Sequence, residues 1–276
     1  MINLFKILFF FIFTWMLIAP FLLDYNDPIQ KSGVKVQKIT INKAPTVEKP
    51  LHSVKIPDFA KIKNIAEKKR AFFNFLSPAI KKENAKLLAL REKLLTIQKT
   101  QSFSTNDQTF IDKLAKQFRV KANLNTEQKL DELIKRVDQV PEALVLVQAA
   151  NESAWGTSRF ARVGLNFFGI WCYKPKCGMV PKGRTSGDIH EVAAFKSVND
   201  AVQGYFYNIN THPAYQTFRD IRAHLREENQ PLYPEILASG LLAYSERGEH
   251  YVVEITKMIE QNKAYFQQPE ALTIAE

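Results

Sequence analysis

The chain has 276 residues, of which 46% are hydrophobic and 24% are charged, and its formal net charge is +10 at pH 7. This composition supplies enough apolar residues for a hydrophobic core and excludes a wholly disordered chain. The positive charge is concentrated in residues 31–100, which hold 17 Lys and Arg against 5 Asp and Glu. Such a segment suits an anionic lipid surface or wall polymer, or is simply a solvated surface. It carries no motif typical of nucleic-acid binding, so we expect no nucleic-acid partner.

The N-terminal segment determines the expected compartment. Residues 7–23 are almost wholly apolar, Lys6 precedes them, and the next charge is Asp24. This length is close to that of a bilayer-spanning helix, and no small-residue cleavage site follows it. We therefore expect residues 1–23 to be a transmembrane anchor, with a cleaved signal as the alternative. Lys6 would keep the N-terminus in the cytoplasm, which places the remainder in the periplasm, anchored in the inner membrane.

The composition divides the rest of the chain into four parts. Residues 24–60 read as a basic linker, because they are rich in Pro and Lys and contain few large apolar residues. Residues 61–105 read as a helical extension, in which Pro78 separates a short helix from a longer one beginning near Ser77. Residues 106–264 form the main domain, and residues 265–276 are a tail.

The periodicity of apolar residues predicts mostly helices in the main domain. Two short strands, at 180–182 and 189–195, are expected around a turn at 185–188. The fold class is therefore mainly α, of the α+β kind, with a small β-hairpin lobe. The predicted helices cover residues 107–118, 126–137, 141–155, 198–210, 217–228, 233–238 and 250–263.

Glu152 is the first candidate for chemistry. It follows a long apolar helix that contains no other carboxylate after Glu142. Partial burial there would raise the pKa of a carboxyl group and keep it protonated near neutral pH. A glycosidase needs such a group to protonate the leaving glycosidic oxygen. The alternative is a solvated or capping Glu at a helix end.

Cys172 and Cys177 are the two cysteines of the chain. A structural zinc site needs four ligands, and the sequence has neither a second Cys pair nor a metal-binding His spacing. In an exported chain the simpler interpretation is one local disulfide between them. We therefore expect a disulfide, no metal and no cofactor.

Three ordered segments carry a family resemblance. Residues 151–156 read NESAWG, residues 166–170 read NFFGI, and residues 243–251 read AYSERGEHY. They resemble the E-S-x-W-G, N-x-F-G and Y-A-T-D-P-x-Y segments of the glucosaminidase domain of bacterial wall hydrolases. The resemblance extends over about residues 50–262. Three further segments look like the Bax branch of this family: residues 70–94, 171–178 and 210–215.

The resemblance implies a lysozyme-like helical fold and hydrolysis of the β-1,4 bond after N-acetylglucosamine in peptidoglycan. By position, Glu152 matches the general acid of the family, and Tyr244 matches a tyrosine that positions the substrate. Phe167 and Tyr173 are additional aromatic residues that can stack on sugar faces. The other candidates for substrate contact are Trp155, Asn166, Phe168, Trp171 and Tyr251.

The second carboxylate is where this chain departs from the family. Many members carry a Glu on the first strand of the hairpin, whereas residues 179–184 read MVPKGR. Asp188 and Glu191 are the nearest candidates for a catalytic partner. Without one, the N-acetyl group of the substrate can act as nucleophile. A peptidoglycan-binding scaffold without cleavage and a lytic transglycosylase remain the alternative functions.

Overall fold

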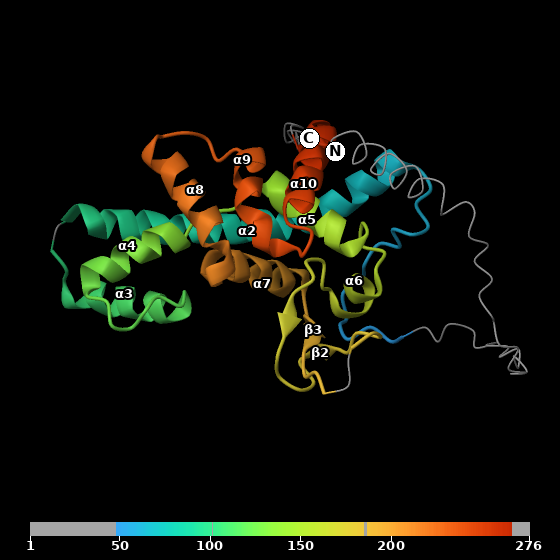
Figure 1. Cartoon of the computed structure of the whole chain (residues 1–276), viewed down its shortest axis with the longest axis horizontal. Helices are drawn as coiled ribbons and strands as arrows, with labels where there is room; N and C mark the ends of the chain where they lie inside the picture. The colour runs from blue at the N-terminus through green and yellow to red at the C-terminus, as the bar shows by residue number, and fades with distance from the viewer. Residues whose placement is uncertain (1–47, 101, 185–186, 267–276) are drawn as a thin grey trace, which may run out of the picture. The chain divides into compact units, whose positions relative to one another are not determined.

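Most of the chain outside the termini is described by a computed structural model, which covers residues 48–100, 102–184 and 187–266 (Figure 1). The predicted class is confirmed, because helices dominate and a single small sheet accompanies them in this part of the chain. The helices are α2 (Ile65–Thr100), α3 (Thr105–Gln117), α4 (Thr126–Arg136), α5 (Glu142–Ser153), α6 (Arg159–Gly164), α7 (Val198–Thr211), α8 (Gln216–Glu227), α9 (Pro234–Ala238), α10 (Glu249–Gln261) and α11 (Lys263–Phe266). Two short 3₁₀ helices, η1 (Pro213–Tyr215) and η2 (Ser239–Tyr244), precede α8 and α10.

The helices α3 and α4 begin at local signals. Ser104 and Asp107 form a capping box at the start of α3, in which each side chain accepts the backbone N–H of the other residue. Asn125 and Gln128 form the same reciprocal pair at the start of α4. These bonds satisfy amide groups that a helix leaves free at its N-terminus. The predicted starts therefore agree with the structure to within two residues.

The predicted break at Pro78 is wrong. The helix α2 is continuous and contains Pro78 in its interior, so Ser77 does not cap a second helix. Pro78 has no N–H group to donate to the carbonyl of Asn74. Both residues are exposed on the solvent face of the helix. The opposite face is buried, and the Ser77 hydroxyl donates a hydrogen bond to Glu142 at the start of α5. Tertiary burial therefore holds the helix together across the proline.

The sheet differs in part from the prediction. It has three short strands, β1 (Trp171–Cys172), β2 (Gly178–Met179) and β3 (Glu191–Ala193), in the antiparallel order β1-β3-β2. The strand expected at 189–195 is present as β3, but residues 180–182 are not a strand, and β1 was not expected. A Cβ at Gly178 would lie 2.0 Å from the Val192 carbonyl oxygen, so this close approach requires glycine. The short helix α6 was also not predicted.

The apolar helix predicted from Pro141 is confirmed as α5, which lies at the centre of the core. It contacts α2, α9 and α10, and Figure 1 shows α10 beside it. Residues 144–150 are all buried. The predicted linker differs from the expectation near its end, because Phe59 is fully buried and its ring packs against Phe72. Residues 54–59 therefore contribute to the same core that surrounds α5.

The N-terminal segment predicted as a transmembrane anchor, residues 1–23, lies outside the described residues. Among the helices that the structure describes, none is long and apolar enough to cross a bilayer.

A buried ion cluster ties three helices to the start of α5. Asp138 lies just before α5 and is 1% exposed. Arg226 of α8 donates to both of its oxygens at 3.0 and 2.9 Å, and Arg91 of α2 lies 3.5 Å from it. Arg222 donates to four carbonyl oxygens between residues 135 and 139. Burial alone would raise the pKa of Asp138, but the charges of these arginines outweigh it and hold the pKa below its usual value.

Replacing Asp138 should therefore destabilise the fold strongly. Asp138→Asn leaves buried guanidinium groups without their counter-charge, and we expect a loss of about 3–5 kcal/mol in the free energy of unfolding, measured in urea. Asp112→Asn, which breaks the exposed pair with Lys129, is the control and should cost at most about 1 kcal/mol. Equal losses in the two variants would contradict a special role of the buried cluster.

Candidate active site

The end of α5 determines where Glu152 lies. The helix stops one residue later, and the next three residues have left-handed backbones: Ala154 (φ 50°), Trp155 (φ 57°) and Gly156 (φ 75°). Residues other than glycine rarely adopt this conformation, and such strain is concentrated at functional sites. A Cβ at Gly156 would lie 2.5 Å from the Phe59 ring, so this turn also requires glycine for packing. The turn therefore fixes the carboxylate at a sharp and tightly packed bend.

Glu152 borders a cleft of about 500 Å³. Its walls come from the loop before β1, from β1 itself, from the end of α7, and from η1 and η2. Among the described residues that line it, Glu152 is the one with a carboxylate. The others are Phe160, Phe168, Gly169, Ile170, Trp171, Tyr173, Pro181, Val192, Asn208, His212, Tyr215, Ala243 and Tyr244. A cleft lined by aromatic and apolar residues with one acid has the usual character of a small-molecule binding site.

The electrostatics of Glu152 agree with the expectation from the sequence. Burial raises the pKa of its carboxyl group. A hydrogen bond from Tyr251 and the charge of Arg247 oppose this effect without cancelling it. The side chain is therefore biased toward the protonated form, while a donor stands ready to stabilise the carboxylate once the proton has left.

Two tyrosines lie against this acid and are themselves held in place. Tyr251 is fully buried, and burial together with the nearby Glu152 raises the pKa of its phenol, which keeps the hydroxyl proton in place. The Tyr244 ring stacks on Tyr251 with centroids 5.5 Å apart, and its hydroxyl donates to the Phe168 carbonyl at 2.8 Å. Tyr244 lines the cleft as predicted, whereas Tyr251 contacts Glu152 from within the core.

The NFFG segment keeps the space in front of Glu152 open. Asn166 is buried and binds backbone groups through its whole amide, donating to Ile170 and Ala193 and accepting from Phe168 and Ile170. It therefore shapes the loop instead of lying in the cleft, where the sequence analysis placed it. Gly169 has φ 67°, and a Cβ there would lie 3.7 Å from a Glu152 oxygen. A larger side chain at this position would occupy the space beside the acid.

The aromatic candidates separate into two groups. Trp171 and Tyr173 line the cleft and remain 47% and 69% exposed, and Phe168 lines it while stacking on Tyr205 at 4.4 Å. Trp155 packs against Phe72 and Phe73 of α2, at 5.7 and 5.4 Å. Phe167 is fully buried against the same helix. Neither Trp155 nor Phe167 lines the cleft, so their predicted sugar contacts are not supported.

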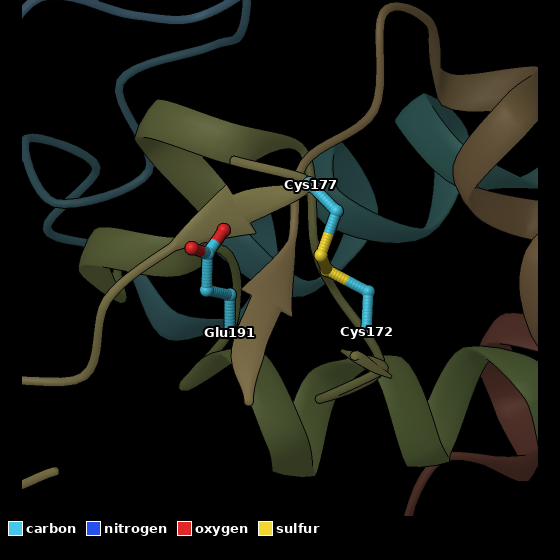
Figure 2. Close-up of side chains that lie close together, drawn as sticks. All are labelled: Cys172, Cys177 and Glu191. Carbon is cyan, nitrogen blue, oxygen red and sulfur yellow. A yellow bond between two sulfur atoms is a disulfide. The ribbon is translucent and has the colours of Figure 1, made fainter. Parts of the chain in front are cut away.

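The disulfide predicted between Cys172 and Cys177 is confirmed, with Cα atoms 6.2 Å apart (Figure 2). Glu191 on β3 lies beside it and accepts backbone N–H groups from Lys176 at 3.0 Å and Gly178 at 2.8 Å. These bonds lower the pKa of Glu191. The sulfur atoms and this carboxylate lie within 4.8 Å of one another, but the sulfurs are bonded to each other and offer no thiolate ligand.

Neither candidate for a second catalytic carboxylate lines the cleft. Both oxygens of Glu191 are occupied by the loop between β1 and β2, so this residue supports the cleft wall that carries Trp171 and Tyr173. Asp188 is exposed in the turn before β3. The structure therefore brings Tyr244, Phe168 and Trp171 together with Glu152, but not Glu191 or Asp188.

The chain is similar to known proteins. Residues 127–264, half of the chain, match the model of the glucosaminidase family, described as mannosyl-glycoprotein endo-beta-N-acetylglucosaminidase. The chain belongs to this family. Protein bax of Escherichia coli (strain K12) is 34% identical to it over 212 residues, which cover 76% of each chain. No solved structure matches the chain. The glucosaminidase domain is therefore that of a glycoside hydrolase-like enzyme, as the three sequence segments indicated.

Sequence reasoning missed several residues that surround the acid. Gln148 lies four residues before Glu152, on the same face of α5, and is fully buried. Its amide is the one polar side chain within the apolar run LVLVQAA, and this was the signal that could have identified it from the sequence. Tyr215 and Arg247 carried no comparable signal, because they approach Glu152 only through the arrangement of η1 and the segment before α10.

The two tryptophans should respond differently to truncation. Trp155→Ala removes packing against α2, and we expect the free energy of unfolding to fall by about 2–3 kcal/mol. Trp171→Ala leaves stability within about 0.5 kcal/mol, because the ring is half exposed, but it should weaken binding of wall glycan fragments about tenfold. Thermal unfolding and a fragment titration measure the two effects. The reverse pattern would place the sugar contact at Trp155.

Proposed function

We propose that this glucosaminidase-family protein is an endo-acting peptidoglycan hydrolase that cleaves the β-1,4 bond after N-acetylglucosamine. The observation that carries the proposal is Glu152, a half-buried carboxyl group with a raised pKa at the edge of an aromatic-walled cleft. Family membership supports a glycan substrate. Helices and strands both contribute residues to the cleft that Glu152 borders, which supports a lysozyme-like arrangement of two lobes around that substrate.

In the first step, the Glu152 carboxyl group donates its proton to the glycosidic oxygen as the C1–O bond breaks. Its raised pKa favours the protonated form that this step requires. The Tyr251 hydroxyl then stabilises the carboxylate that remains. In this proposal Trp171 and Tyr173, which line the cleft, stack on the sugar rings, and Tyr244 contacts the substrate from the same cleft; the support is that all three residues line it.

The nucleophile that we propose is the N-acetyl oxygen of the substrate. Among the described residues that line the cleft, Glu152 is the one with a carboxylate. In this mechanism the acetamide oxygen attacks C1 as the leaving sugar departs, and a cyclic oxazolinium intermediate forms. Water then opens the ring, and the Glu152 carboxylate takes its proton. The catalytic cycle thereby closes with one protein carboxylate.

A second candidate function is glycan binding without cleavage. The same observation favours it, because a cleft that holds one carboxylate departs from the pair that most glycosidases use. Such a protein would hold the glycan strand through the aromatic wall and recruit other wall enzymes.

Digestion of purified peptidoglycan decides between the two functions. We expect residues 48–276 to release soluble fragments and Glu152→Gln to reduce the rate about 10²–10⁴-fold, because the amide cannot supply the proton. Asp188→Asn, also an acid-to-amide change, should keep most of the wild-type rate, and a large loss would contradict the substrate-assisted step. Binding without release by the wild type would favour the second function.

Mass spectrometry of the fragments then tests the bond. Reducing-end N-acetylglucosamine is the expected product. An anhydromuramic end would show a lytic transglycosylase instead, and would overturn the hydrolytic mechanism.

We also propose that the protein is anchored in the inner membrane and acts in the periplasm. The support is the apolar run of residues 7–23 and the positive charge of residues 31–100. In fractionated cells, full-length protein should sediment with the inner membrane and keep Met1. A soluble form with a new N-terminus near Asp24 would instead indicate a cleaved signal.

A further inference from the structure

A chain of buried hydrogen bonds ends at Glu152. The Tyr205 hydroxyl, on α7, donates to Oε1 of Gln148 on α5. Nε2 of Gln148 donates to the Tyr251 oxygen, on α10, at 2.9 Å. The Tyr251 hydroxyl in turn bonds to the Glu152 carboxyl group. Gln148, Tyr205 and Tyr251 are each at most 1% exposed, so water does not compete for these bonds.

The two ends of the Gln148 amide give this chain a direction. A carboxamide has one acceptor end and one donor end, and Tyr205 occupies the acceptor end. The donor end therefore faces Tyr251 and engages a lone pair of its oxygen. The single hydroxyl proton of Tyr251 is then left to point at Glu152. A donor bond to the phenol oxygen also polarises its hydroxyl and strengthens the bond that this hydroxyl donates.

We propose that Gln148 is a positioning residue, oriented by Tyr205, that directs and strengthens the hydrogen bond from Tyr251 to the catalytic acid. The inference rests on the proposed function for its consequence in catalysis, but the hydrogen-bond chain itself does not depend on that function. Gln148 is fully buried and does not line the cleft, so it acts through Tyr251. Its role is to stabilise the Glu152 carboxylate that proton donation produces.

Other charged and titratable groups also face Glu152 from the elements that pack around it. The segment before α10 carries Arg247, whose charge lowers the pKa of Glu152, and α10 carries Glu254, whose charge raises it. Arg247 and Glu254 also pair with each other at 2.7 Å. The remaining titratable neighbours are Tyr205 of α7, Tyr215 of η1 and Tyr244 of η2, together with His212 on the cleft wall. None of these is altered by a change at Gln148, apart from the bonded Tyr205.

The sign of the expected effect follows from the bond. The Tyr251 hydroxyl bonds to the charged form of Glu152 and lowers its pKa against the effect of burial. Weakening this bond therefore raises the pKa of Glu152. Because the acid is active when protonated, the alkaline limb of the pH–rate profile moves to higher pH, while kcat falls as the carboxylate product loses stabilisation.

The test is a carbon-13 titration of the Glu152 carboxyl group, assigned with Glu152→Gln, in a series of folded variants. We expect Gln148→Met and Tyr205→Phe to raise the pKa of Glu152, and Tyr251→Phe to raise it further. Tyr207→Phe removes a hydroxyl two residues away on the same helix, where Arg119 lies over the ring, and should leave the pKa unchanged. On the wall substrate, Gln148→Met should lower kcat about tenfold with KM nearly constant.

A double-mutant cycle separates positioning from general packing. In the Tyr251→Phe background, Gln148→Met should produce no further rise in the pKa of Glu152, because its effect passes through the missing hydroxyl. An unchanged pKa in both Gln148→Met and Tyr205→Phe, with normal melting curves, would overturn the proposal, and so would a full additive effect in the double variant. A wild type that does not digest the wall would refute the proposed function alone, since the titration needs no activity.

Discussion

The burial of α5 is the constraint on which the rest of the structure depends. This apolar helix is surrounded by α2, α9 and α10. It ends at Glu152 and Ser153, and a turn of residues with left-handed backbones follows. The carboxylate therefore emerges where the core meets the cleft. Partial burial raises the pKa of this carboxyl group, and buried polar groups of neighbouring helices contact it on the side that faces the core. The raised pKa of Glu152 is thus a consequence of the position at which α5 ends.

The segments before the family match are part of this arrangement. Residues 127–264 match the family model, yet α2 and residues 54–59 form much of the core that packs against α5. Phe59 contacts the glycine turn after Glu152, and Phe72 and Phe73 hold Trp155. These segments therefore pack directly against the turn that follows Glu152. This packing gives a physical reason for the segments before residue 127 to accompany the domain.

The opposite wall of the cleft is stabilised differently. Strands of two or three residues cannot hold a sheet by their own hydrogen bonds. Here the Cys172–Cys177 disulfide and the two backbone bonds accepted by Glu191 close the loop that carries Tyr173 (Figure 2). Glu191, which the sequence suggested as a catalytic carboxylate, therefore stabilises this wall of the cleft. The cleft therefore has Glu152 on its helical side and, on the opposite side, an aromatic wall that the disulfide and these hydrogen bonds stabilise.

The sequence by itself determined the features that depend on neighbours along the chain. Apolar periodicity predicted α3, α4 and α5, and the NESAWG, NFFG and AYSERGEHY segments identified the family. Only the tertiary structure decided that α2 continues through Pro78, that Trp155 and Asn166 serve packing and loop shape, and that Gln148 meets Tyr205 and Tyr251. Those outcomes depend on residues that are far apart in the chain but share one buried environment. Local sequence encodes the propensity of each side chain, but the partners that satisfy a buried amide or carboxylate exist only after the helices have packed.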